Sequence, residues 1–168
     1  MVVVGLDIGA VRIGVAASDP SGVLASPRQV IRRSSNAAAI AAIARVVDET
    51  HAERVVVGLP VSFDGQLHGQ AKSVQSFAEK LRPRLSVELV YADESLSTVR
   101  AEEAMRAAGV RPDRIRERID AAAAAVILQD YLDQQRVENR AANITDRTDP
   151  WPQSEDSARA DERGRPGI

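Results

Sequence analysis

The chain has 168 residues with 22 Lys and Arg against 24 Asp and Glu, a formal net charge of −2, and a length that favours one domain with a real core. It contains no cysteine, which excludes disulfides, zinc–thiolate sites and thiol catalysis and suits a reducing compartment. An apolar strand begins directly after Met1, and no apolar run approaches the roughly 20 residues of a membrane span, so we expect a cytoplasmic protein with no signal peptide and no membrane partner.

The first predicted element is a strand over residues 2–8 that enters a hairpin and resumes over residues 12–18. Its β-branched and leucine residues are typical of a strand buried on both faces. Asp7 stands at the end of this run, and Gly9 allows the tight turn. A carboxylate there needs a metal ion, a phosphate-bound metal or a basic side chain as its partner. A turn-forming Asp that accepts hydrogen bonds from nearby amides is the alternative.

The remaining elements alternate between strands and helices. We expect strands over 23–31, 55–59 and 87–92, and helices over 36–50, 70–82, from about Ser95 to Gly109, and over 117–136. Three strands in a meander followed by βαβ crossovers predict an α/β fold, a mixed five-stranded sheet flanked by helices. Residues 60–69 follow a strand, at the edge where open sheets bind ligands.

The C-terminal residues differ in composition from the rest. Beyond residue 136 the chain lacks periodic apolar residues and is rich in Asp, Arg, Ser, Pro and Gly. We therefore divide it into one domain over residues 1–136 and a disordered tail over residues 137–168. Trp151 lies in this tail between two prolines, and we expect it to be solvated, with a docking residue as the alternative. We expect a monomer or a weak homodimer.

Acidic residues at the ends of elements are the candidate functional residues. Asp93 and Glu94 follow a buried strand, and Asp120 begins the apolar face of the last predicted helix. For Asp120 the alternative is a first-turn acid that the helix dipole favours, by about 0.3–1 kcal/mol. A cluster of such carboxylates is costly unless cations neutralise it. Oxygen ligands without Cys favour Mg²⁺ or Mn²⁺ over zinc.

Four motifs occur in order along the chain: Gly5–Ala16, Val57–Gly65, Asp93–Thr98 and Ile119–Leu132. Together they resemble the bacterial family of Holliday-junction resolvase-like proteins, whose members are also described as pre-16S rRNA nucleases with an RNase H-like fold. The resemblance spans residues 1 to about 135. It therefore implies an RNase H-like nuclease domain.

The resemblance also implies an acidic triad of Asp7, Glu94 and Asp120 that serves as catalytic and metal-ligating group. Strand alternation alone does not choose between Asp93 and Glu94; the resemblance does. Two departures from the family pattern put substrate contacts in question more than the triad. Ser95 stands where the family typically carries arginine, and Ala10-Val11 replace the usual Thr-Lys pair.

The function that the resemblance implies is a divalent-metal-dependent endonuclease that hydrolyses phosphodiester bonds. Three carboxylates can hold two ions about 3.5–4 Å apart astride a phosphodiester. The family's description ranks processing of the 5′ end of pre-16S rRNA in ribosome biogenesis first, with resolution of branched DNA, the Holliday junction, as the alternative. The expected partner is nucleic acid, and the expected cofactor is Mg²⁺ or Mn²⁺.

Five arginines are candidate nucleic-acid contacts: Arg12, Arg111, Arg114, Arg116 and Arg118. Arg12 lies near Asp7 and either contacts a phosphate or pairs with an acid. The other four lie in a predicted loop before Asp120, from which they could guide a nucleic-acid backbone toward the triad. A charged, solvated loop is the alternative.

Two functions from other classes remain open. The Asp-x-Gly hairpin also occurs in the actin and sugar-kinase superfamily, where it serves ATP and magnesium, although those proteins generally use two such domains. A non-catalytic protein that binds nucleic acid or ribosome precursors is the second. Retention of all three candidate acids argues against it.

Overall fold

A computed structural model describes residues 1–60, 69–93, 106–107, 109 and 112–145, with the backbone alone for residues 112–118 and 144–145. The elements are β1 (Val3–Ile8), β2 (Arg12–Ser18), β3 (Ala25–Arg32), α1 (Asn36–Thr50), β4 (Arg54–Leu59), α2 (Gly69–Leu81), the 3₁₀ turn η1 (Arg82–Arg84), β5 (Glu88–Asp93) and α4 (Pro112–Thr145). In this part of the chain, no helix has the length and apolarity to cross a membrane.

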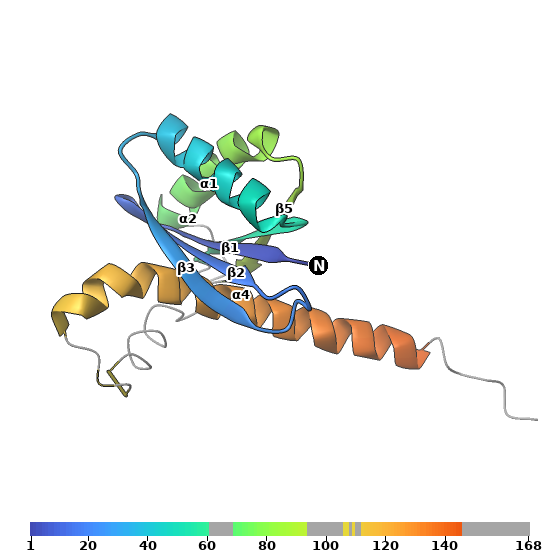
Figure 1. Cartoon of the computed structure of the whole chain (residues 1–168). Helices are drawn as coiled ribbons and strands as arrows, with labels where there is room; N and C mark the ends of the chain where they lie inside the picture. The colour runs from blue at the N-terminus through green and yellow to red at the C-terminus, as the bar shows by residue number, and fades with distance from the viewer. Residues whose placement is uncertain (61–68, 94–105, 108, 110–111, 146–168) are drawn as a thin grey trace, which may run out of the picture.

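The five strands form one mixed sheet in the order β3-β2-β1-β4-β5. The β1–β2 and β2–β3 pairs are antiparallel, and the β1–β4 and β4–β5 pairs are parallel. Helices α1 and α2 cover one face, and α4 crosses the other (Figure 1). The predicted mixed five-stranded sheet with flanking helices is confirmed.

Strand alternation divides the interior into two cores. Val4, Leu6 and Ile8 of β1 pack in the cluster beneath α1 and α2. Val3 packs instead with α4, and a Cβ on Gly5 would lie 2.7 Å from the Cβ of Leu128. The odd-numbered residues of β1 therefore face α4. Asp7 belongs to this set.

Helix α1 has the limits that the sequence predicts. The amide of Ala38 donates a hydrogen bond to the Ser35 hydroxyl at 3.1 Å, so Ser35 is the N-cap. His51 ends the helix in the left-handed region, with φ of 52°. The ends of this helix are thus fixed by local signals.

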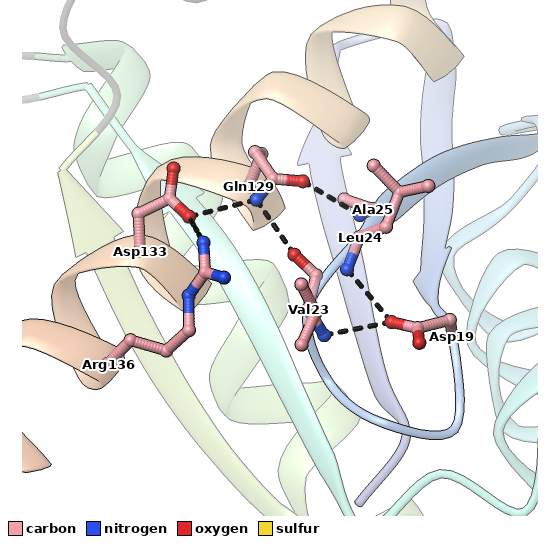
Figure 2. A network of polar contacts seen from close by, with 7 residues as sticks. All are labelled: Asp19, Val23, Leu24, Ala25, Gln129, Asp133 and Arg136. Carbon is pink, nitrogen blue, oxygen red and sulfur yellow. Dashed lines mark hydrogen bonds and ion pairs between the residues drawn. The ribbon is translucent and has the colours of Figure 1, made fainter.

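Strand β3 starts at Ala25 rather than at the predicted residue 23. The amides of Val23 and Leu24 each donate to one carboxylate oxygen of Asp19 at 2.8 Å, which keeps both residues in the turn (Figure 2). Helix α4 holds the same turn, because Gln129 Oε1 accepts from the Ala25 amide and its Nε2 donates to the Val23 carbonyl. The turn and the helix are therefore connected.

Helix α4 is longer at both ends than the predicted helix over 117–136. It begins at Pro112, so Arg114, Arg116 and Arg118 belong to a helix and the expectation of a loop is wrong. Proline suits the first helical position, and the acid that follows it suits the helix dipole. At the other end, residues 137–145 are helical rather than disordered, and α4 projects past the sheet (Figure 1).

The C-terminal extension has a simple cause. Glu138, Arg140, Ala141 and Ala142 are good helix formers, and adding residues to an existing helix needs no new nucleus. Residues 146–168, Trp151 included, lie outside the described residues, and the domain boundary at residue 136 stays a prediction. The helix predicted from Ser95 also lies outside them except at residues 106–107 and Gly109. Gly109 has the left-handed φ of 73° expected of a helix-ending glycine.

Candidate active site

Asp7 lies near the end of β1, where the chain turns into β2. The turn is closed by a hydrogen bond from the Gly9 amide to the Arg12 carbonyl at 2.9 Å. A Cβ on Gly9 would lie 2.6 Å from the same oxygen, so only glycine permits this closure. Across the strand pair, Asp7 is directly opposite Gly14. The residue next to Asp7 on this face of the sheet is therefore Gly14, which has no side chain.

Asp120 reaches the same place from α4. A Cβ on Gly14 would lie 1.8 Å from the Asp120 carbonyl oxygen and 2.2 Å from its carbonyl carbon. The backbone of α4 therefore touches the backbone of β2 at Gly14, the strand partner of Asp7. Two acids that are far apart in sequence thus flank one glycine on one face of the sheet.

Arg12 forms an ion pair with Asp120. Its Nε donates to Asp120 Oδ2 at 2.8 Å, and the two side chains are 48% and 24% exposed. Of the two uses considered for Arg12, the structure shows pairing with an acid. Within the described part of the chain, no residue accepts a hydrogen bond from its two Nη groups. A guanidinium carries five N–H donors, so the contact with Asp120 uses only one of them.

Strand alternation decides which face of the sheet Asp93, the last residue of β5, belongs to. Leu89 and Tyr91 belong to the core beneath α1 and α2, whereas Val90 and Ala92 pack against the α4 cluster. Asp93 is an odd-numbered residue of β5, like Leu89 and Tyr91, so its side chain lies on the α1 and α2 side of the sheet. It is exposed there and does not share a face with Asp7. Glu94 lies outside the described residues.

Several predicted site residues cannot be placed by their side chains. Arg111 lies outside the described residues, and Arg114, Arg116 and Arg118 are described by their backbone alone. Among the residues that are described, no three His, Asp or Glu side chains are grouped to hold one metal ion. The structure thus places Asp7 on the same face of the sheet as the Arg12–Asp120 ion pair, with Gly14 between Asp7 and the Asp120 backbone.

Two residues that the sequence did not single out support this site. Gly14 permits the contact with α4, and a glycine inside a strand is a known signal of close backbone approach. Arg33 donates to the Gly9 carbonyl at 3.0 Å, and its guanidinium lies 4.6 Å from the centre of the Phe77 ring. No local pattern connects Arg33 with Phe77, because the two lie on different elements.

Comparison with known proteins places this geometry in context. A family model described as "RuvX: Holliday junction resolvase" matches residues 1–134. A "Putative pre-16S rRNA nuclease" of Roseiflexus sp. (strain RS-1) is 42% identical over 134 residues, which cover 80% of this chain and 95% of the relative. A protein of the same name from Mycobacterium ulcerans (strain Agy99) is 43% identical over 133 residues, 79% of this chain and 78% of the relative.

Solved structures agree on the fold. T. thermophilus RuvC in complex with a Holliday junction substrate matches with a TM-score of 0.54 at 16% identity, over 81% of this chain and 96% of that one. The fowlpox virus resolvase in complex with Holliday junction DNA matches with a TM-score of 0.52 at 11% identity, over 80% and 99%. These likenesses bear on the fold alone and confirm the predicted RNase H-like class. The family match sets aside the sugar-kinase alternative.

Proposed function

The chain belongs to the RuvX family, and from that membership we propose that it is a divalent-metal-dependent endonuclease that hydrolyses phosphodiester bonds. Its relatives at 42% and 43% identity both carry the name "Putative pre-16S rRNA nuclease", and we propose the 5′ end of pre-16S rRNA as the substrate. A cytoplasmic location fits this substrate and stays a prediction, as does the oligomeric state.

The observation that carries the proposal is the meeting of Asp7 and Asp120 at Gly14. Both acids lie toward the carboxyl end of β1, and the parallel strands β4 and β5 end at the same edge. Ligands of open sheets bind at that edge. Continuing the β1–β4 register one residue past the Leu6–Val57 pair leads from Asp7 to Gly58, which is paired with Ala92 of β5. Gly58 has no side chain and Ala92 only a methyl group, so neither position adds a bulky side chain next to the carboxylate.

We propose Asp7, Glu94 and Asp120 as the catalytic and metal-ligating residues. The choice of Glu94 is supported by the alternation in β5. Its even-numbered residues Val90 and Ala92 face α4, and position 94 is the next even-numbered one along the chain. Three carboxylates offer the hard oxygen ligands that Mg²⁺ and Mn²⁺ prefer. When bound, such ions activate a water for in-line attack and stabilise the leaving oxygen.

Arg12 has a positioning role in this proposal. Its ion pair fixes the guanidinium beside Asp120, and its Nη groups can donate to a phosphate oxygen of the substrate. We also propose Arg111, Arg114, Arg116 and Arg118 as backbone contacts. They precede Asp120 on the chain, so a strand bound along the start of α4 leads to the carboxylates.

The test is a cleavage assay on two substrates side by side, a pre-16S rRNA fragment and a four-way DNA junction, each with Mg²⁺, Mn²⁺, Ca²⁺ or excess chelator. We expect the RNA to be cut with Mg²⁺ or Mn²⁺ and spared with Ca²⁺, whose coordination is larger and looser. Cutting of the junction alone would favour the resolvase alternative, which the family's description supports. Binding without cutting would favour a non-catalytic protein, and full activity in chelator would contradict the metal site.

A further inference from the structure

Three arginines lie on β3 or directly after it, and they differ in their partners. Arg28 pairs with Glu49 of α1 at 3.9 Å. Arg33 lies over the Phe77 ring and supports the β1–β2 turn. The third, Arg32, is exposed, and no residue of the described chain forms an ion pair or a hydrogen bond with its side chain. Arg32 is therefore the one arginine of this set without a structural role in the described residues.

Arg32 lies directly opposite Arg12 in the β2–β3 pair. The adjacent pair, Ile13 and Ile31, packs in the core beneath α1 and α2. Both arginines consequently project to the other face, where Arg12 meets Asp120. Directly opposed residues have Cβ atoms about 4.5–5.5 Å apart, and like charges at that distance repel. An anion held between the two guanidinium groups relieves this repulsion.

The two arginines differ in how many of their N–H donors already have an acceptor. Among the described residues, Arg12 donates through Nε alone, to Asp120, whereas no N–H group of the Arg32 side chain has an acceptor. Paired guanidinium groups suit the oxygens of a phosphodiester, which they bind through parallel hydrogen bonds. Because β3 is the last strand of the sheet on this side, a polymer can continue past Arg32 without meeting another strand.

We propose that Arg32 is a nucleic-acid contact that, together with Arg12, holds a phosphate of the substrate backbone next to the phosphate at the carboxylates. The bound strand then leaves the site across the β3 edge. This inference rests on the proposed nuclease function and adds to it a second phosphate position, at the Arg12–Arg32 pair of β2 and β3.

The experiment is a salt titration of binding with the full chain and a labelled single-stranded RNA from the 5′ region of pre-16S rRNA, in Ca²⁺ to prevent cutting. For Arg32→Ala we expect binding to weaken about fivefold, the loss of one exposed charge contact. The slope of log affinity against log salt should flatten by about 0.7. Arg32→Lys should retain most of the slope, because it keeps the charge.

Arg28→Ala is the matched control, since it removes an arginine of the same strand that pairs toward α1. Its slope should equal that of the wild type. The melting temperature of Arg32→Ala should be unchanged or slightly higher, because the variant removes a like-charge neighbour.

The possible outcomes distinguish a failure of the Arg32 contact from a failure of the proposed nuclease function. If the wild type binds and cuts RNA, and Arg32→Ala has the same slope of log affinity against log salt as the wild type, the Arg32 contact is overturned and the proposed function stands. An equal loss of slope in Arg28→Ala also overturns it, because the effect is then one of net charge. If the wild type neither binds nor cuts either substrate, both the Arg32 contact and the proposed nuclease function are overturned.

Discussion

Replacing Gly14 by alanine tests whether the contact between β2 and α4 positions the carboxylates. The new Cβ would lie 1.8 Å from the Asp120 carbonyl oxygen. Helix α4 must then move from β2 by about 1.6 Å, the difference between that distance and the 3.4 Å at which ordinary contact begins. Both contacting groups belong to the backbone, so no side-chain rotation relieves the clash.

The size of the effect follows from this displacement. Overpacking costs about 1–3 kcal/mol, and a backbone clash belongs at the upper end. In a domain of this size each kcal/mol lowers the melting temperature by about 2–4 °C, so we expect a fall of about 6–12 °C. A misplacement of about 1 Å also costs about 100-fold in rate, so cleavage should fall by that factor where the variant is still folded.

The assay combines thermal unfolding with single-turnover cleavage well below the melting temperature. Gly69→Ala is the control, because a Cβ there meets nothing within 4 Å, and its melting temperature should be unchanged or slightly raised. Wild-type stability and cleavage in Gly14→Ala would refute the reasoning. It would mean that α4 does not rest on β2 at this point, and the geometric case for pairing Asp7 with Asp120 would be lost.

Amide replacement of each proposed carboxylate should lower cleavage by more than about 100-fold and leave the melting temperature nearly unchanged, because ligation needs the charge. The variants are Asp7→Asn, Glu94→Gln and Asp120→Asn. Hydrogen bonds from the Leu24 amide, the Ser21 hydroxyl and other turn amides hold the pKa of Asp19 well below its ordinary value. The stability that Asp19 contributes is therefore present above pH of about 4 and lost in more acid solution, so the melting-temperature gap to Asp19→Asn should narrow there. Truncation after Thr145 should change neither stability nor cleavage, and a blue-shifted, quencher-resistant emission from Trp151 in the intact chain would contradict a solvated tail.

The sequence predicts most elements because their ends carry local signals. A serine cap and regular apolar spacing give the limits of α1, and buried β-branched runs give the strands. The predicted limits of α4 are wrong because apolar periodicity shows which part of a helix is buried against the sheet, not where the helix begins and ends. Its C-terminal residues 136–143 are exposed, so apolar periodicity does not mark their helical state.

The candidate site is predicted less completely, because it depends on contacts between distant segments. The motif around Asp7 is local, whereas its meeting with Asp120 depends on the close approach at Gly14. The choice between Asp93 and Glu94 likewise needs the facing of β5, which is set by the residues that pack on each side of it. Helical spacing predicts the face of Asp120, but the strand pattern alone does not decide which of Asp93 and Glu94 lies on the same face as Asp7.

Arg12 shows why some roles cannot be ranked from local sequence at all. Pairing with an acid and contacting a phosphate look like alternatives when the side chain is considered alone. In the structure Nε donates to Asp120, and no residue of the described ranges accepts from either Nη group, so pairing with an acid does not by itself exclude the proposed phosphate contact. The pair is exposed and contributes about 0–1 kcal/mol, too little to explain it as a stabilising device. The pair instead holds the guanidinium beside Asp120, and that position is set by the packing of α4 on β2, which brings in a segment far from Arg12 in the sequence.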